Sequence, residues 1–384
     1  MPLTRPLKIA ITCYPSVGGS GILATTLGEE LAARGHEIHF ISYERPFRLP
    51  YNTPRLHFHP VEINSYGLFK YPDYTLPLSV KLAETSRDYG LDIIHAHYAV
   101  PHATAALLAR DMLPPDQAPK VITTLHGTDT TLLGKDPGYG PAIRHALEAA
   151  DGITAVSAFL RAETQRVIGV QRPIEVIHNF FTPRTPNRTR ADVRHELGVG
   201  DGDVLLFHSS NLRPLKRVDV LLDAFARVQK YAPCKLLILA GGDFSAYAAE
   251  VARLGIGERV IVRENISAIE EYIQAADLGF FTSETESFCL SILEAMSFNC
   301  PCVATKVGGI PEVNLDGETG ILVPLGDTEG LVVALATLIN DPVLRDRMGA
   351  AARLRAEKTF SADIIVERYL QFYYQVCAGS SRLI

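Results

Sequence analysis

The chain has 384 residues, more than one hydrophobic core usually accommodates, so we expect two domains. It carries 37 basic and 43 acidic residues, and its net charge of −6 argues against a general surface for nucleic acid or anionic membranes. No apolar run approaches the roughly 18 residues of a membrane span, and the N-terminus lacks a signal-peptide pattern, so we expect a cytoplasmic protein. The six cysteines form no C-x-x-C pair, which indicates reduced, mostly buried thiols.

A glycine loop follows the first strand-like run. GSGILA (residues 19–24) opens a helical pattern and has an acid, Glu44, about 20 residues further on, which matches the dinucleotide-binding fingerprint. Residues 14–17 separate the loop from its strand, however, whereas the fingerprint turns at once. We therefore expect the backbone N–H groups of this loop to approach a phosphate or a carboxylate. The alternative is that the loop binds the dinucleotide of a nicotinamide or flavin enzyme. The residues concerned are Gly18, Gly19 and Gly21.

Strand-like and helix-like patterns alternate along the chain. The strand-like runs include three stretches that are apolar without polar alternation, at 92–94, 204–207 and 235–239, as in parallel strands covered by helices on both faces. The runs occupy 7–13, 37–42, 91–95, 120–125, 152–156 and 174–177, and then 203–209, 235–240, 259–262, 277–281, 301–304 and 320–323. The sequence therefore predicts an α/β protein of two doubly wound, Rossmann-like domains with about six strands each.

The break between the two series lies near residues 179–198, whose Pro, Arg, Thr and Asn content is typical of a linker. We place the domains at 1–180 and 181–360. Residues 361–384, with Ser361 as the N-cap of a last helix, should pack back on the first domain. We expect the carboxyl ends of the two sheets to face each other across one cleft, where such sheets bind ligands.

One loop of the second domain carries two glutamates. We expect a helix to begin near Phe288, which puts Glu286 in the loop and Glu294 two turns into the helix. Carboxylates accept paired hydrogen bonds from sugar hydroxyls, and the helix N-terminus between them offers free N–H groups to an anion. The pair therefore suits a nucleotide sugar, and the alternative is two solvated surface charges.

A second loop of this domain carries cations at the start of a predicted helix. Arg213, Lys216 and Arg217 oppose the helix macrodipole there, and a bound diphosphate would explain them. The alternative is a surface turn with solvated basic residues.

These motifs resemble a known family. E-S-F-C-L-S-I-L-E-A-M (286–296), the strand at 301–305 and GGIPE (308–312) are similar to the E-x7-E signature of retaining glycosyltransferase family 4. The resemblance covers essentially the whole chain and implies a GT-B fold. The sequence departs from the pattern at four positions. The family usually has glycine where this chain has Ser287, Cys289 and Asn299, and it commonly has arginine where this chain has Asn211. We expect Asn299 to adopt the left-handed conformation that asparagine tolerates.

Motifs of the first half narrow the resemblance to the branch that glycosylates L-malate in bacillithiol biosynthesis. They are ITCYPSVGGSG, GHEIHFIS, PFRL, HAHYAVPHA and TTLHGTD. The resemblance implies UDP-N-acetylglucosamine as donor, L-malate as acceptor, and front-face attack that retains configuration without a covalent intermediate. We expect no cofactor and no essential metal, and a homo-oligomer stays open.

Roles are expected for individual residues. Lys216 and Arg213 would stabilise the leaving diphosphate, Glu286 would hold the sugar hydroxyls and Glu294 the ribose, and His126 would serve either the acceptor or the donor sugar. The donor set is Gly18, Gly19, Asn265, Ile266, Glu286, Phe288, Cys289, Leu290 and Glu294. The acceptor set is Ser20, Tyr98, Thr124, His126, Asn179 and Arg213.

Three short motifs have a structural interpretation that we prefer. His95 and His97 suggest a metal but lack a visible third ligand. Asp201-Gly-Asp203 matches a D-x-D metal motif but precedes its strand, so we expect a tight turn. Cys300-Pro-Cys302 resembles a redox pair but leads into a strand. Other functions remain open: a different acceptor, a UDP-sugar epimerase or binding protein of the same architecture, and an inactive scaffold.

Overall fold

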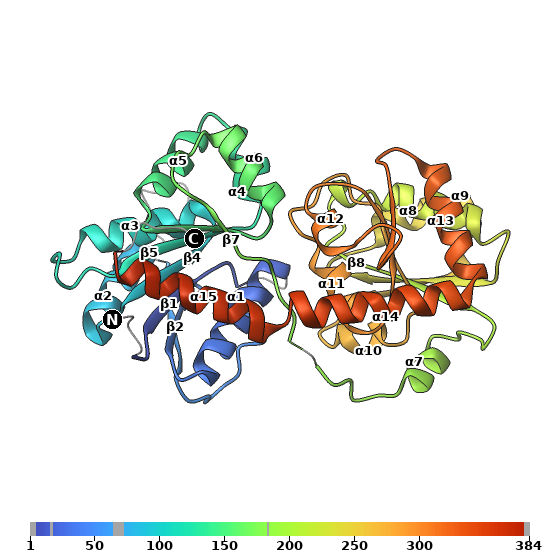
Figure 1. Cartoon of the computed structure of the whole chain (residues 1–384), viewed down its shortest axis with the longest axis horizontal. Coiled ribbons are helices and arrows are strands. Elements are labelled where there is room, and N and C mark those ends of the chain that lie inside the picture. Colours follow the sequence, from blue (N-terminus) through green and yellow to red (C-terminus); the bar gives the residue numbers. More distant parts are fainter. Residues whose placement is uncertain (1–4, 16–17, 64–72, 183, 380–384) are drawn as a thin grey trace. The chain divides into compact units, whose positions relative to one another are not determined.

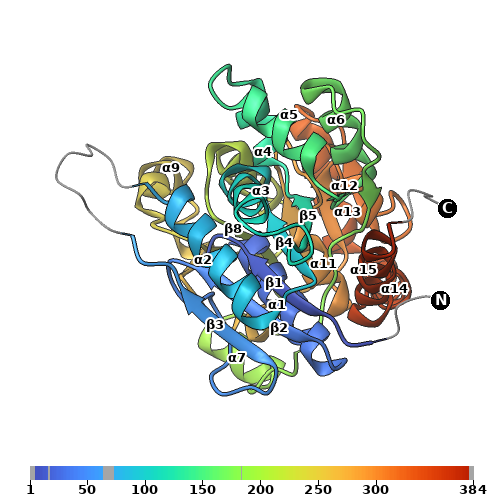
Figure 2. The ribbon, with the colours of Figure 1, turned by 90° about the vertical axis from the view of Figure 1, so that its left-hand side faces the viewer.

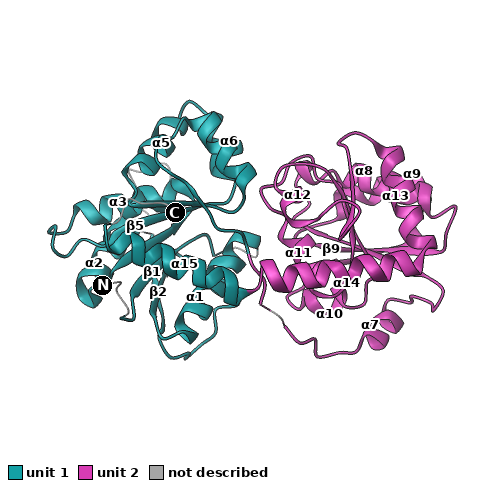
Figure 3. Cartoon of the chain, in the orientation of Figure 1, with its two compact units in different colours: residues 1–179, 362–384 teal, residues 180–361 magenta. Residues whose placement is uncertain are grey.

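The structure is a computed structural model that describes residues 5–15, 18–63, 73–182 and 184–379. The chain divides into two compact units, which consist of residues 1–179 with 362–384 and of residues 180–361 (Figure 3). The first unit is discontinuous because the last helix returns to it. Two stretches named above, residues 16–17 of the glycine loop and 380–384 of the C-terminal segment, lie outside the described residues.

The first unit contains a seven-stranded parallel sheet in the order β3-β2-β1-β4-β5-β6-β7 (Figure 1). In chain order, β2 and β3 are added on one side of β1, and the strands from β4 onward are added on its other side. The position between β1 and β4 is therefore the switch point, where doubly wound sheets bind ligands. The strands are β1 (Lys8–Thr12), β2 (Glu37–Ser42), β3 (Leu56–Pro60), β4 (Ile93–His97), β5 (Lys120–Leu125), β6 (Gly152–Ala155) and β7 (Glu175–Val176).

Helices cover both faces of this sheet. The helices α2 and α3 pack side by side (Figure 2). Leu78, Leu82 and Ala106 of these helices form a core with Ile94 and Ala96 of the sheet. On the other face α15 contacts α1 and reaches the sheet. The helices are α1 (Gly19–Ala33), α2 (Thr75–Tyr89), η1 (Ala99–Ala103), α3 (Thr104–Asp111), α4 (Thr128–Thr131), η2 (Leu133–Lys135), α5 (Gly140–Ala149), α6 (Ala158–Ile168) and α15 (Ala362–Cys377).

The second unit contains a six-stranded parallel sheet in the order β10-β9-β8-β11-β12-β13. Its switch point lies between β8 and β11. The strands are β8 (Val204–Ser210), β9 (Cys234–Ala240), β10 (Val260–Glu264), β11 (Leu278–Phe281), β12 (Cys302–Thr305) and β13 (Gly320–Val323).

The apolar stripe of α8 explains how this unit packs. Leu221, Leu222 and Phe225 recur at helical spacing and are wholly buried against the sheet and α13. The helices are α7 (Arg190–Glu196), η3 (Pro214–Lys216), α8 (Val218–Val228), η4 (Ser245–Tyr247), α9 (Ala248–Leu254), η5 (Gly257–Arg259), α10 (Ile269–Ile273), α11 (Leu290–Ser297), α12 (Ile310–Val313), α13 (Thr328–Asn340) and α14 (Pro342–Thr359).

Three local expectations were wrong. The first sheet has a further edge strand, β3, with the sequence Leu-His-Phe-His-Pro, which was not expected. The expected linker at 179–198 contains α7, which begins with a capping box between Thr189 and Asp192 instead of an apolar stripe. The helix expected near Phe288 begins at Leu290, so Glu294 lies little more than one turn into it instead of two.

Candidate functional site

Two charged residues of the second unit, Lys216 and Glu286, lie at its switch point. Lys216 follows β8 and Glu286 follows β11, and the Lys216 ammonium donates to Glu286 Oε1. Only 16% and 11% of the two side chains are exposed. Burial alone lowers the pKa of Lys216, but the adjacent Glu286 carboxylate reverses this effect and the net shift is upward. The structure thus brings together two residues that are 70 positions apart in the sequence.

Hydrogen bonds fix this pair in place. Ser283 Oγ donates to Glu286 Oε1 over 2.8 Å, so both contacts go to the same carboxylate oxygen. Thr282 Oγ1 donates to the carbonyl of Lys216 over 3.1 Å, and the Glu284 N–H donates to the carbonyl of Leu215 over 2.7 Å. The loops after β8 and β11 therefore form one polar edge, on which Glu286 Oε2 has no hydrogen-bond partner among the residues that the structure describes.

Two glycines after β12, Gly308 and Gly309, pack against the backbone of Glu286 and Ser287. A Cβ atom on Gly308 would lie 1.9 Å from the carbonyl oxygen of Glu286, and one on Gly309 would lie 2.2 Å from that of Ser287. Gly308 also has a φ of +54°, which glycine adopts without strain. These glycines thus allow the loops after β11 and β12 to meet at the backbone of Glu286 and Ser287.

The two arginines of the basic loop differ in their surroundings. Arg217 pairs with Asp219 in the first turn of α8, over 2.9 Å. Arg213 is exposed, and within the described ranges its guanidinium has only a 3.4 Å contact with the side-chain oxygen of Asn211. Arg213 lies close enough to Lys216 to oppose the charge on its ammonium. It is therefore the cation of this loop that remains free to bind an anion.

The start of α11 separates the two glutamates. Cys289 precedes the helix with a φ of +73°, which explains why glycine is usual here in the family that the sequence resembles. Phe288 and Cys289 are buried, so only their backbone can face a ligand, whereas Leu290 and Glu294 are half-buried. Burial raises the pKa of the Cys289 thiol, which favours its protonated form. Asn299, after this helix, has a φ of +56°, which confirms the left-handed conformation expected for it.

The loop after the edge strand β10 holds Asn265 and Ile266, which were expected in the donor set. Asn265 is exposed with a φ of +53°, and its N–H donates to the carbonyl of Ala240 over 2.8 Å. Ile266 is half-buried.

Sequence reasoning missed one residue that supports this edge. His208 on β8 is buried, with Nδ1 3.0 Å from the carbonyl oxygen of Phe280 and Nε2 2.8 Å from Ser210 Oγ. Burial lowers the pKa of His208 to about 4. The neutral ring thereby ties β8 to β11 beside the loop of Lys216.

In the first unit, the glycine loop and the residue after β4 meet at the switch point. Gly18 caps α1 without a side chain, and the N–H of Gly21 donates to its carbonyl over 3.0 Å, so the N–H groups of Gly19 and Ser20 are the ones available to an anion. The Tyr98 hydroxyl donates to Ser20 Oγ over 2.8 Å. Tyr98 has a φ of +80°, a rare conformation for tyrosine that directs its ring toward α1.

His126 and a buried aspartate lie beside them. His126 Nε2 is 2.8 Å from His97 Nδ1, and its ring stacks on that of His97 and contacts that of Tyr98. Burial lowers the pKa of His126 to about 3, so the ring is neutral. Asp129 accepts from the N–H groups of Gly127 and Ala99 and thereby joins the loops after β5 and β4. Burial raises the pKa of Asp129 to about 6.

Thr124 does not offer a free hydroxyl. Its side chain is wholly buried, and its Oγ1 lies 2.7 Å from His95 Nε2 and 2.6 Å from Thr154 Oγ1. Tyr373 of α15 completes this network at His95 Nδ1, over 2.8 Å. The structure therefore gives Thr124 a packing role, and a direct contact with the acceptor is not available to it.

Several buried polar atoms at this edge have no hydrogen-bond partner within the described residues. Asn179 Oδ1, expected in the acceptor set, is among them. The others were missed by the sequence reasoning: Thr12 Oγ1, His97 Nε2 and Thr123 Oγ1. Because an unpaired buried polar group is costly, this concentration at the carboxyl ends of β1, β4 and β5 is typical of a polar ligand site.

Comparisons with known proteins identify the family. Residues 189–355 match the model for glycosyl transferases group 1, and residues 17–184 match that for Glycosyltransferase Family 4. An N-acetyl-alpha-D-glucosaminyl L-malate synthase of Bacillus anthracis is 42% identical over 372 residues, which cover 96% of this chain and 97% of that protein. The chain is a family 4 glycosyltransferase.

Other relatives agree with this assignment. A D-inositol 3-phosphate glycosyltransferase of Kribbella flavida is 30% identical over 306 residues, 72% of this chain and 70% of that protein. A sucrose-phosphate synthase of Thermosynechococcus elongatus superposes with a TM-score of 0.79 at 22% identity, over 97% of this glycosyltransferase and 100% of that chain. Anabaena HepE in complex with UDP and glucose gives 0.75 at 21% identity, over 95% and 99%. The family resemblance and the GT-B fold are confirmed, and the dinucleotide reading of the glycine loop is wrong.

Two of the short motifs of this glycosyltransferase, Asp201-Gly-Asp203 and Cys300-Pro-Cys302, belong to a turn and to the start of a strand. The Asp203 N–H donates to the carbonyl of Gly200 over 3.1 Å, which confirms a tight turn before β8. Cys300 and Cys302 are free and buried, and Cys302 begins β12. Of the helices within the described ranges, none combines the length and the apolar character needed to cross a membrane.

Proposed function

We propose that this glycosyltransferase moves N-acetylglucosamine from UDP-N-acetylglucosamine to the hydroxyl of L-malate, with retention of configuration. The observation that carries the proposal is the 42% identity, over 96% of the chain, to a protein named for a glucosaminyl-malate synthesis. The chemistry of the two switch points supports it, because one offers a lysine–glutamate pair and the other offers neutral polar groups without partners.

The second unit binds the donor in this proposal. Glu286 accepts hydrogen bonds from the sugar hydroxyls through Oε2, and Glu294 accepts those of the ribose. The first N–H groups of α11, at Leu290, bind the diphosphate. Uracil meets the backbone at Asn265 and Ile266.

The first unit binds the acceptor. Ser20, Tyr98, His126 and Asn179 supply polar atoms for the malate carboxylates and hydroxyl, and Asn179 Oδ1 gains the partner that it lacks. The N–H group of Gly19 adds a donor for a carboxylate or for the donor phosphate. Among the described residues, the second ring nitrogen of His126 has no protein partner and can reach a ligand.

Transfer then needs no covalent enzyme intermediate. The malate hydroxyl attacks the anomeric carbon from the face that the diphosphate leaves, the carbon–oxygen bond to UDP breaks, and the leaving phosphate oxygen takes the hydroxyl proton. Lys216 and Arg213 stabilise the charge that develops on this oxygen, and the fixed positions of both substrates lower the remaining barrier.

The test is release of UDP from UDP-N-acetylglucosamine, measured with and without a panel of hydroxy acids. We expect release to require L-malate and to yield N-acetylglucosaminyl malate. Release only with another hydroxyl compound would identify a different acceptor. A rearranged sugar formed without any acceptor would show an epimerase, and either result would contradict the proposal.

A further inference from the structure

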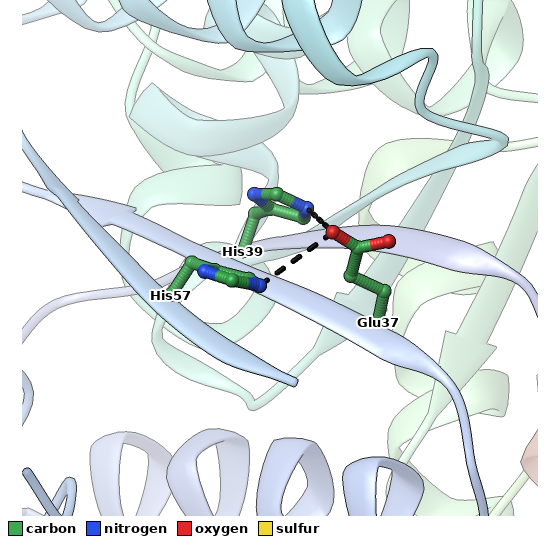
Figure 4. A group of neighbouring side chains, drawn as sticks. All are labelled: Glu37, His39 and His57. Atoms are coloured by element: carbon green, nitrogen blue, oxygen red, sulfur yellow. Dashed lines mark ion pairs between the residues drawn. The ribbon is translucent and has the colours of Figure 1, made fainter. Parts of the chain in front are cut away.

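Two histidines and a glutamate form a group on the first unit that glycosyl transfer does not use. β2 and β3 are parallel, and their register places His39 directly opposite His57. Side chains alternate between the faces of a strand, so Glu37, two residues before His39, shares the face of both histidines. Figure 4 shows the three side chains turned toward one another.

Both imidazoles direct Nε2 at one carboxylate oxygen. His39 Nε2 and His57 Nε2 each lie 3.5 Å from Glu37 Oε1, and the three atoms all lie within 4.8 Å of one another. Ligands placed tetrahedrally around zinc at about 2.0–2.1 Å are roughly 3.3–3.4 Å apart. Two of the three separations therefore already fit a shared ion.

The ring of His39 is prepared to bind a metal. It is wholly buried, yet among the described residues its Nε2 has no hydrogen-bond partner, while its Nδ1 lies 2.9 Å from His59 Nε2. When Nδ1–H donates to His59, Nε2 keeps its lone pair, as in metal-bound histidines held by a second hydrogen bond.

The surrounding groups leave the site accessible. Lys8 Nζ lies 3.8 Å from Glu37 Oε2, which leaves Oε1 to the histidines. Tyr89 of α2 packs against His39 with ring centroids 4.5 Å apart. The His57 side chain is 42% exposed, so its ring, stacked on His39 at 4.7 Å, has room to rotate until the two lone pairs converge.

We propose that Glu37, His39 and His57 bind one Zn²⁺ ion, with water as the remaining ligand. The ion would join β2 to the edge strand β3 in the amino-terminal half of both strands. The residues proposed for glycosyl transfer in this unit follow the carboxyl ends of the strands. The metal therefore stabilises the edge of the sheet and takes no part in transfer.

The test is Zn²⁺ binding to the chelator-treated full-length chain, measured by equilibrium dialysis and by thermal unfolding. We expect one bound equivalent and a higher Tm with Zn²⁺, because the folded chain alone holds the site. His57→Ala, which removes a half-exposed ring, should weaken binding at least tenfold and abolish the Tm rise, and Glu37→Gln should do the same.

His145→Ala is the matched control, because His145 is an exposed histidine on α5 of the same unit. It should bind Zn²⁺ as the unmodified chain does. His39→Ala is avoided, because it empties a buried position and would destabilise the unit without regard to metal. Absence of a bound equivalent in the unmodified chain, or undiminished binding by His57→Ala, would overturn the proposal.

Discussion

Replacing Lys216 by methionine tests the central pair of the second unit. The variant keeps the apolar stem of the side chain but removes the ammonium, and Glu286 then retains only the Ser283 hydroxyl among its described partners. Breaking a buried ion pair from one side costs about 3–5 kcal/mol. Ser283 and the residual exposure of 11% offset part of this, so we expect a loss of about 3 kcal/mol. For a unit of this size that lowers Tm by roughly 6–12 °C.

A double-mutant cycle separates the pair from its parts. Glu286→Gln leaves the ammonium unpaired at a similar cost, whereas Lys216→Met with Glu286→Gln removes both charges. The double variant should therefore be more stable than the sum of the single losses predicts, by about 2 kcal/mol. Arg217→Met is the control in the same loop: its pair with Asp219 has side chains 37% and 58% exposed, so the loss should stay below about 1 kcal/mol.

Activity distinguishes catalysis from folding in these variants. Loss of one preorganised charge donor should lower kcat/KM about 10²–10³-fold in Lys216→Met, and the double variant should regain stability without regaining this activity. Because the folded-state pKa of Lys216 is raised, the stabilising contribution of the pair is complete below the ordinary lysine pKa of about 10.4 and is lost only as pH rises through the folded value. The Tm difference should thus be constant from about pH 6 to 9. Strictly additive single losses, or recovered activity in the double variant, would refute the reasoning.

Four further results are expected. Glu294→Ala should weaken UDP binding by about 1.5–3 kcal/mol, since a charged acceptor for the ribose is lost; unchanged affinity of the folded variant in calorimetry would remove that role. Turnover should survive excess EDTA, and rescue by Mg²⁺ or Mn²⁺ of a chelator-inactivated enzyme would contradict this. Arg213→Ala should raise the KM for malate if Arg213 binds a carboxylate, or lower kcat at saturating malate if it binds the leaving phosphate. Lactate lacks the second carboxylate and should therefore react poorly, and equal kcat/KM values for lactate and L-malate would exclude a dicarboxylate pocket. Since the pKa of His126 is lowered to about 3, its charge does not change between pH 5 and 8, so kcat/KM should show no inflection near pH 6.5 from this ring, and His126→Gln should leave the shape of the profile unchanged.

The strands were the most predictable part of the fold. Apolar runs without alternation, such as the one in β9, mark strands covered on both faces. All twelve expected strands lie within one or two residues of strands in the structure. β3 was missed because it lies at the sheet edge, where its residues are only half-buried and leave a weaker apolar signal. α7 was missed because Arg190 and Arg194 hold it through Asp277, and such ion pairs leave no apolar period in the sequence.

The candidate site was less predictable than the fold. The E-x7-E spacing indicated Glu286, and the cation excess before α8 indicated Lys216, but neither revealed that the two side chains pair. The polar atoms without partners among the described residues, such as His97 Nε2, depend on which strand ends meet, and one sequence does not encode that in any local pattern. Thr124 stands beside His126 in the sequence, yet its hydroxyl is committed to His95 and Thr154.

The discontinuity of the first unit has a consequence during synthesis. Residues 1–179 leave the ribosome first, but Tyr373 and Phe372 of α15, which contact His95 and the strand at Gly152, are made only after the entire second unit. The part of the amino-terminal sheet that α15 covers, at His95 and Gly152, therefore stays exposed while the second unit is made and folds. A nascent chain stalled before residue 362 would expose this part of the sheet to chaperones, and a chain that lost its last helix to proteolysis would return to the same state.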